Sequence, residues 1–106
     1  MTSDVVALLL TAPDEETGRR IARALVEERL AACVNVLPGV CSIYRWKGAV
    51  EEASEVMLVA KTRASRAAAL AARVRALHPY ELPEVLALPV TDGSQAYLRW
   101  VVAESR

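Results

Sequence analysis

The chain has 106 residues, 54% of them hydrophobic, and 13 basic side chains balance 13 acidic ones. This length predicts a single domain over residues 1–106, and the balanced charge excludes a field that would attract nucleic acid or an acidic membrane surface. The apolar share is high for a small monomer, which favours burial of additional surface between copies of the chain.

Cysteine usage and the N-terminal residues bear on the compartment. Cys33 and Cys41 form neither a disulfide framework nor a CxxC pair, so we expect both thiols to be reduced and buried. The N-terminus has no basic n-region, and its apolar run, residues 5–10, is too short for a membrane span. These features predict a cytoplasmic protein without a membrane partner.

The first two elements expected from the N-terminus are a strand and a helix. Residues 5–11 form a continuous apolar run, which is typical of a strand in the middle of a sheet. Asp14 stands where an N-cap is needed before an amphipathic helix over residues 15–30. Gly18 inside that helix indicates either close packing or a tolerated defect, and both interpretations stay open.

The middle of the chain predicts a strand followed by a long β-hairpin. Residues 32–37 form the second strand, which Pro38 and Gly39 are expected to end. Residues 40–46 and 50–62 form the arms of the hairpin around a short turn. At roughly 3.3 Å per residue the second arm spans about 43 Å, whereas a compact chain of this size is roughly 34 Å wide. The hairpin should therefore protrude from its own domain.

A protruding hairpin exposes strand edges and apolar side chains that another copy of the chain can cover. Val40, Tyr44 and Trp46 lie on one face of the first arm. Tyrosine and tryptophan are enriched at the centres of protein interfaces. We therefore take these three residues as candidate contacts between chains.

The charged residues of the second arm differ in their expected surroundings. Glu51, Glu52 and Glu55 predict a solvated face near the tip of the hairpin, where they also protect the strand edge from aggregation. Lys61 emerges from an apolar run, so it needs either a structural partner such as Glu84 or the mouth of a binding site.

The last third of the chain predicts a helix, a strand and a second helix. Ser65 is expected to cap the first of these helices, and Pro79 ends it. Residues 84–90 form a strand, in which Pro89 indicates an edge or a bulge, and residues 95–104 form a C-terminal helix. The complete order, β-α-β-β-α-β plus a terminal helix, predicts an α+β fold of the ferredoxin-like kind, with the first and third strands central.

One loop and its neighbours gather most of the residues that could bind a ligand. His78 ends the second helix, where it interacts either with the last carbonyl groups or with a ligand. Tyr80, Glu81 and Glu84 follow it in a loop, which is where binding groups are often found. With a single histidine, no phosphate-binding loop and no nucleophile motif, the sequence predicts no catalytic residues and no enzyme.

The chain carries four motifs in a fixed order: LAACVNVLPG at residues 30–39, SIYRWKG at 42–48, HPYELPE at 78–84 and YLRW at 97–100. Together they resemble the CutA family of divalent-cation tolerance proteins, and the likeness covers essentially the whole chain. The resemblance implies a cytoplasmic, ferredoxin-like homotrimer, similar in architecture to the PII signal proteins and linked with copper tolerance and divalent-metal binding.

The resemblance also indicates where a metal ion would bind. The copper ligands proposed in the family, a cysteine and a pair of histidines, fall on Leu10, Leu77 and His78 of this chain. Only His78 keeps a ligand type, and one imidazole does not fill a copper site. The expected cofactor is therefore Cu²⁺ or another divalent cation, weakly bound at His78.

The leading functional hypothesis is a homotrimer whose partners are its own copies and divalent metal ions. One alternative is a PII-like sensor that binds a small anionic ligand in clefts between subunits through Lys61, Lys47 and Arg63. Another alternative is a trimeric scaffold without a ligand. The residues expected in the clefts between subunits are Lys61, Tyr80, Glu81, Glu84 and Trp100.

Overall fold

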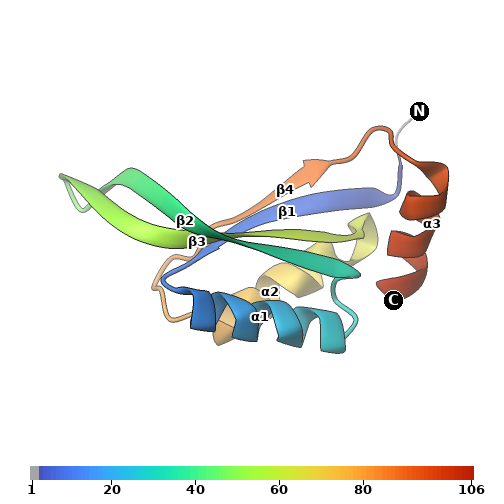
Figure 1. Cartoon of the computed structure of the whole chain (residues 1–106), viewed down its shortest axis with the longest axis horizontal. Helices are drawn as coiled ribbons and strands as arrows, with labels where there is room; N and C mark the ends of the chain where they lie inside the picture. Colours follow the sequence, from blue (N-terminus) through green and yellow to red (C-terminus); the bar gives the residue numbers. More distant parts are fainter. Residues whose placement is uncertain (1–2) are drawn as a thin grey trace.

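The computed structural model describes residues 3–106. Its elements are β1 (Val5–Ala12), α1 (Glu15–Glu27), β2 (Cys33–Trp46), β3 (Ala49–Arg63), a 3₁₀ turn (Ala64–Arg66), α2 (Ala67–Leu77), β4 (Val85–Pro89) and α3 (Gln95–Glu104). The strands form one antiparallel sheet in the order β2-β3-β1-β4, and α1 and α2 lie together on one of its faces (Figure 1). This confirms the α+β, ferredoxin-like arrangement, with β1 and β3 central.

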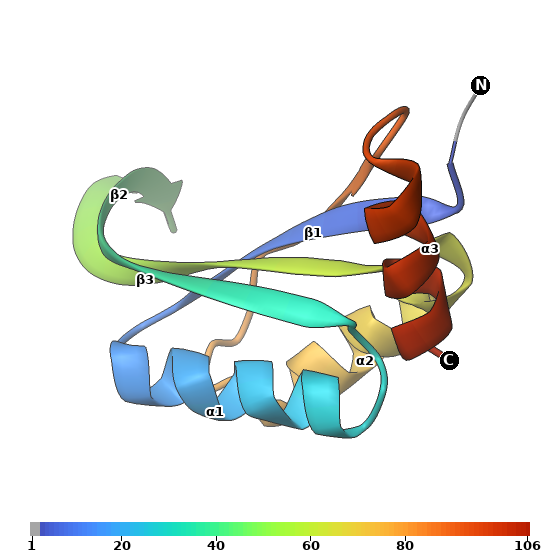
Figure 2. The same cartoon turned by 45° about the vertical axis from the view of Figure 1, so that its right-hand side comes forward.

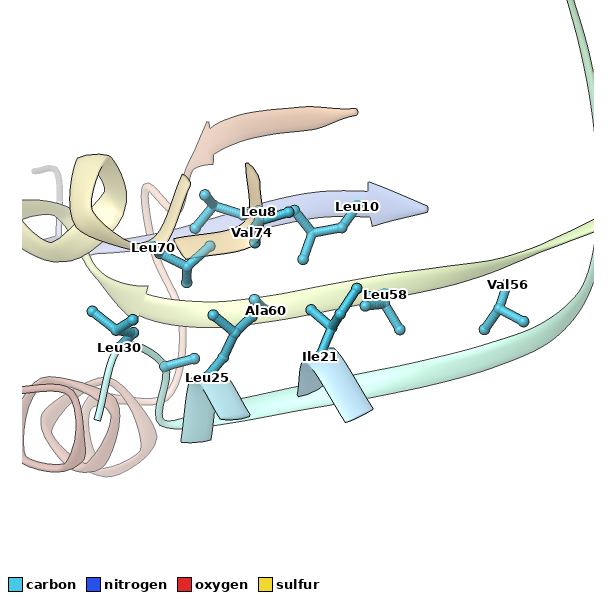
Figure 3. Packing of buried hydrophobic residues seen from close by; sticks show 11 residues of the cluster. Leu8, Leu10, Ile21, Leu25, Leu30, Val56, Leu58, Ala60, Leu70 and Val74 are labelled. Carbon is cyan, nitrogen blue, oxygen red and sulfur yellow. The ribbon is translucent and has the colours of Figure 1, made fainter. Parts of the chain in front are cut away.

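The hydrophobic core lies between the sheet and the two helices that cover it. Leu8 and Leu10 of β1 pair with Ala60 and Leu58 of β3, and all four point to the helical side. Figure 3 shows how the side chains of α1 and α2 pack against these strands. The apolar runs recognised in the sequence are therefore the strands that are buried on this face.

The opposite face of the sheet, which we call the outer face, is covered by α3 at one end, where Val101 of that helix packs against Val5 of β1, and carries no other helix in the part of the chain that the structure describes (Figure 1). Leu9 of β1 lies on it between Val59 of β3 and Leu86 of β4. Leu86 is 54% exposed and Leu88 is 46% exposed. Because β-strands alternate their side chains, an apolar run leaves half of its side chains on this outer face.

The long hairpin projects from the domain as expected, and the molecule measures 43 × 27 × 23 Å (Figure 1). A two-residue turn joins its arms, and both Lys47 and Gly48 have positive φ, as a type I′ turn requires. The expectation that Pro38 and Gly39 end the second strand is wrong. β2 continues through them with a shift in register, and Gly39 has a φ of 80°, so a β-bulge absorbs both residues while pairing with β3 resumes.

The ends of the helices confirm some expectations and correct others. Asp14 caps α1, accepting a hydrogen bond from the Thr17 amide at 2.7 Å. α1 ends at Glu27 and not at residue 30, because the chain turns at Arg29, whose φ is 59°. Ser65 does not cap α2, because it lies inside the 3₁₀ turn that precedes the helix, and α2 begins without a side-chain cap.

Gly18 marks a close approach of α1 to the sheet. A Cβ atom at this position would lie 3.3 Å from the Leu58 Cδ2 atom and 3.5 Å from the Val56 Cγ1 atom. The 3.3 Å separation is tighter than an ordinary van der Waals contact, so a larger residue would push the helix away from β3. Of the two interpretations of Gly18, close packing is confirmed.

Candidate functional site: a pocket beside the hairpin

A pocket of about 730 Å³ lies where the hairpin meets the loop between α2 and β4. The hairpin contributes Tyr44 and Trp46, and the loop contributes Tyr80, Glu81 and Glu84. β3 adds Glu55, which sits where the polar tip of the strand gives way to its buried half. We call this space the hairpin pocket, and its size is within the range of small-ligand sites.

His78 stands beside the pocket, and both of its ring nitrogens are engaged. Nε2 lies 2.6 Å from the carbonyl oxygen of Thr11, and Nδ1 lies 3.1 Å from the backbone nitrogen of Tyr80. A carbonyl only accepts and an amide only donates, so Nε2 donates to Thr11 and Nδ1 accepts from Tyr80. A metal ion at His78 would have to displace one of these hydrogen bonds.

Tyr80 connects the loop to β3. Its hydroxyl group donates a hydrogen bond of 2.8 Å to Glu55 Oε2, and its ring lies 4.6 Å from the His78 ring, centroid to centroid. Burial, together with the neighbouring Glu55 carboxylate, holds the pKa of Tyr80 above its ordinary range. Tyr80 is therefore a permanent hydrogen-bond donor that orients one carboxylate of the pocket.

Glu84 is another carboxylate of the pocket, and its surroundings disfavour the ionised form. Burial, and secondarily the negative charge of Glu55, raise the pKa of Glu84 above its ordinary value. No basic side chain pairs with Glu55 or Glu84 among residues 3–106. Glu55 and Glu84 therefore line the pocket without a basic partner, whereas its third carboxylate, Glu81, lies 3.9 Å from Lys47 Nζ.

Replacing Glu84 with glutamine should raise the free energy of unfolding at pH 7. The raised pKa means that the ionised carboxylate is disfavoured in the folded state, so its cost is present above the folded pKa. The cost vanishes once the pH falls below the ordinary value of 4.5, where both states are protonated. Urea denaturation at several pH values would measure this difference. The matched variant Glu52→Gln, on the exposed hairpin tip, should change little, and destabilisation by Glu84→Gln at pH 7 would contradict the expectation.

The structure separates two of the expected cleft residues from the hairpin pocket. Lys61 does not pair with Glu84; it donates a hydrogen bond to Asn35 Oδ1, and its Nζ lies 4.0 Å from Cys33 Sγ. Trp100 belongs to α3, where its ring packs against Tyr97. This part of β3 lies between β2 and β1, whereas Glu84 precedes β4, which lies beyond β1 at the edge of the sheet. In one chain, therefore, only Tyr80, Glu81 and Glu84 come together.

Of the three basic residues assigned to an anionic ligand, Lys61 and Arg63 lie two residues apart near the end of β3, whereas Lys47 is separated from them within one chain. Lys47 lies in the hairpin turn before β3 begins, over the Trp46 ring and 3.9 Å from Glu81 Oε2. The Lys47–Glu81 pair is exposed on both sides and contributes little to stability.

None of the residues expected at the interface, and neither cysteine, is fully buried in the single chain. Tyr44 is exposed, whereas Val40 and Trp46 are half-buried. Both thiols are free, with Cys41 exposed and Cys33 half-buried. The expectation that both cysteines are buried is wrong for the chain on its own, because β2 turns Cys41 outward on the protruding arm.

Glu55 is the functional residue that sequence reasoning missed. It was grouped with the solvated glutamates of the tip, yet it is only 9% exposed and accepts the Tyr80 hydrogen bond. The available signal was its position directly before Val56, where the apolar half of β3 begins. A carboxylate at the boundary between the exposed and the buried half of a strand has lost most of its contact with water, so it needs a hydrogen-bond donor from the protein.

Two absences hold for residues 3–106. No cluster of three or more His, Cys, Asp or Glu side chains is arranged to hold a metal ion in this part of the chain. None of the helices described in it is long and apolar enough to cross a membrane.

Comparison with known proteins points to one family. Curated relatives include the divalent-cation tolerance protein CutA of Thermus thermophilus, which is 54% identical over 94 residues, covering 89% of this chain and 91% of that protein. Protein CutA of Homo sapiens is 54% identical over 97 residues, covering 92% of this chain and 54% of the human protein. The chain therefore spans about half the length of its human relative.

Solved structures agree with the sequence relatives. CutA from Xylella fastidiosa matches with a TM-score of 0.95 and 46% identity, over 98% of this chain and 100% of that one. The Thermus thermophilus protein matches with a TM-score of 0.94 and 50% identity, over 96% of this chain and 99% of that one. The model of the family described as CutA1 divalent ion tolerance protein matches residues 6–104. The chain belongs to the CutA1 divalent ion tolerance protein family.

Proposed function

We propose that this protein acts in divalent-cation tolerance as a self-associating protein that binds a divalent cation weakly in the hairpin pocket. The family is named for tolerance of divalent ions, and the named relatives are tolerance proteins and not enzymes. The observation that carries the proposal is the pair of carboxylates, Glu55 and Glu84, which share the pocket without a basic partner among residues 3–106.

The chemistry of the pocket favours a cation over a neutral ligand. Burial, and secondarily the Glu55 charge, raise the pKa of Glu84, and a cation between or beside the two carboxylates would favour their ionised forms and relieve the repulsion between them. Tyr80 already fixes one oxygen of Glu55, so the pocket is partly preorganised. Two carboxylates are fewer ligands than a tight site needs, and the remaining positions would be filled by water. Weak binding is the result that this donor set supports.

The donor atoms also bear on the identity of the metal. Carboxylate and carbonyl oxygens suit Mg²⁺, Ca²⁺ and Mn²⁺, whereas imidazole and thiolate suit Cu²⁺. Cu²⁺ at His78 would displace the hydrogen bond that the ring makes with Thr11 or with Tyr80. The donor atoms of the pocket therefore favour an oxygen-ligated cation at Glu55 and Glu84 over Cu²⁺ at His78.

Self-association is supported by surface that the single chain leaves uncovered. Leu86 and Leu88 of the outer face and Ile43 of the hairpin are large apolar side chains that are each roughly half exposed or more. Tyr44 and Trp46 line the hairpin pocket from a projecting arm, so a neighbouring copy would close the pocket as well as cover the arm. We propose a homotrimer, on the family resemblance, and a cytoplasmic location, on the two free thiols.

Titration of the protein with Mn²⁺ tests the cation site. Wild type should bind with low affinity, and the double variant Glu55→Gln, Glu84→Gln should lose about tenfold or more of it, because the charged ligands are gone. The matched control is Glu51→Gln, Glu52→Gln, which removes the same charge from the exposed hairpin tip and should leave binding unchanged.

Cu²⁺ binding by His78→Ala completes the test. A marked loss of Cu²⁺ affinity in this variant, with Mn²⁺ binding unchanged, would place copper at His78. Equal binding by wild type and by both double variants would contradict a site in the hairpin pocket, and absence of any metal binding by the assembled protein would favour a ligand-free scaffold.

A further inference from the structure

A second cavity lies at the opposite end of the sheet from the hairpin tip. α3 stands across the ends of β1 and β3 (Figure 2), and a groove of about 940 Å³ opens beside it. We call it the α3 groove; its polar lining includes Arg63, Arg99, Arg106, Asp4, Asp92 and Gln95. None of these residues lines the hairpin pocket, so what binds here is independent of the function proposed above.

Three arginines reach the α3 groove from separate parts of the chain. Arg63 ends β3, Arg99 lies in α3, and Arg106 follows that helix. Arg99 and Arg106 are exposed, and none of the three lies within 4.0 Å of a side-chain carboxylate oxygen among the described residues. Asp4 and Asp92 line the same groove, but neither forms an ion pair with these arginines, so the three guanidinium groups keep an excess of positive charge over the two carboxylates. This arrangement is therefore suited to an anion.

Arg63 is held in place and keeps unused hydrogen-bonding capacity. Its Nη2 donates to the Val102 carbonyl oxygen at 3.0 Å, and its backbone nitrogen donates to Ser105 Oγ at 3.1 Å. Its Nε is buried and has no hydrogen-bond partner within residues 3–106. A buried donor without a partner is costly, whereas a fixed guanidinium loses little entropy when it binds an anion. Both facts favour a bound oxyanion at this arginine.

The rest of the groove indicates what the anion is attached to. Asp4 and Asp92 contribute two carboxylates to the lining. Asp92 Oδ1 accepts a hydrogen bond of 2.8 Å from the backbone N–H of Gly93. Leu98 and Val102 give the groove a small apolar floor. Carboxylates repel a bare anion but accept hydrogen bonds from hydroxyl groups. The lining thus combines donors for an anionic group with acceptors for a hydroxylated body.

We propose that the α3 groove binds a small phosphate monoester with a hydroxylated body, such as a sugar phosphate. Phosphate offers three terminal oxygens and up to two negative charges, which three guanidinium groups match better than they match a single carboxylate. The hydroxyl groups of the body would donate to Asp4 and Asp92, and the groove has room for a ligand of this size.

Calorimetric titration at physiological salt tests the proposal with three probes: ribose 5-phosphate, ribose and inorganic phosphate. Ribose 5-phosphate should bind and raise the melting temperature, inorganic phosphate should bind more weakly, and ribose should not bind. Arg99→Gln should weaken ribose 5-phosphate binding about tenfold, which is what loss of one charged hydrogen bond predicts. Arg99 is exposed, so this variant should fold even if Arg63→Gln, which loses the contact with Val102, does not.

The matched control is Arg23→Gln, an exposed arginine of α1 that pairs with Glu27 and lies outside the groove. It should leave binding unchanged. No binding of ribose 5-phosphate at millimolar concentration would overturn the proposal. Equal weakening by Arg99→Gln and Arg23→Gln would also overturn it, because it would mean that only the net charge of the protein matters. Equal affinity for ribose 5-phosphate and inorganic phosphate would refute the role of the hydroxylated body.

Discussion

Replacement of Leu58 with alanine should lower the free energy of unfolding by about 2–5 kcal/mol. Leu58 is fully buried in β3, between Leu10 of β1 and Val36 of β2. Its Cδ2 atom lies 3.3 Å from the Cβ position of Gly18 in α1, and Figure 3 shows its side chain beside that of Ile21 of the same helix. Truncation would therefore open a cavity between the helix and the two central strands.

The size of the effect follows from how little this site can collapse. β1 and β3 are hydrogen-bonded to each other along eight residue pairs, so their separation is fixed. The truncation removes Leu58 Cδ2 but leaves Val56 Cγ1 and Ala12 Cβ, which lie 3.5 Å and 3.7 Å from the Cβ position of Gly18, so α1 cannot move much closer to the sheet. A domain of this size is stable by roughly 5–15 kcal/mol, and the loss would be a large part of that total.

Urea denaturation at one fixed protein concentration would measure the loss, because association of folded chains adds to the apparent stability. Leu82→Ala is the matched control, since Leu82 is 72% exposed in the loop before β4 and the same atoms are removed. It should change the free energy of unfolding by less than about 0.5 kcal/mol. Similar losses in the two variants would contradict the assignment of Leu58 to the core.

The parts of the fold that were predictable are those that depend on local pattern. The apolar runs of β1 and β3 identified the central strands, and the length of the second arm predicted the projecting hairpin. Asp14 and Ser94 show that helix starts with a suitable side chain are also readable, since both accept a backbone hydrogen bond. The expected strand end at Pro38 is wrong because a proline ends a strand only where the partner strand cannot accommodate it. Here β2 forms a bulge at Pro38 and stays paired with β3.

The candidate site was less predictable because it depends on contacts between distant parts of the chain. His78 reaches the carbonyl oxygen of Thr11, and Tyr80 reaches Glu55, across separations of 67 and 25 residues. Tyr80, Glu81 and Glu84 were found because they share a loop. The partner expected for Lys61 is wrong because the sequence does not reveal that the side chain of Lys61 reaches Asn35 on the adjacent strand. Side-chain pairs of this kind follow from strand order and register, which single-residue patterns do not determine.

The outer face of the sheet should govern assembly more strongly than the hairpin tip. Val59 is central to it, paired with Leu9 on one side and Asn35 on the other, and Leu86 lies beyond Leu9. Covering large apolar side chains is worth roughly 1.5–3 kcal/mol each, so several together can exceed the cost of association. In the single chain α3 covers only the end of this face that carries Val5, and Val59 is not part of the core, so a polar substitution at Val59 leaves the core untouched.

Val59→Glu should therefore convert the assembled protein into folded single chains. The new carboxylate would be solvated in the free chain but buried without a partner in the assembly, which should raise the dissociation constant by about 100-fold or more. Light scattering should give a mass near three chains for wild type and near one for the variant, with circular dichroism unchanged. Val26→Glu makes the same change on the exposed side of α1, where Val26 is 41% exposed, and should leave the mass unchanged. A wild-type monomer at micromolar concentration, or an assembled Val59→Glu protein, would show that the outer face does not join the chains. A monomeric wild type would also contradict the proposal that a neighbouring copy closes the hairpin pocket.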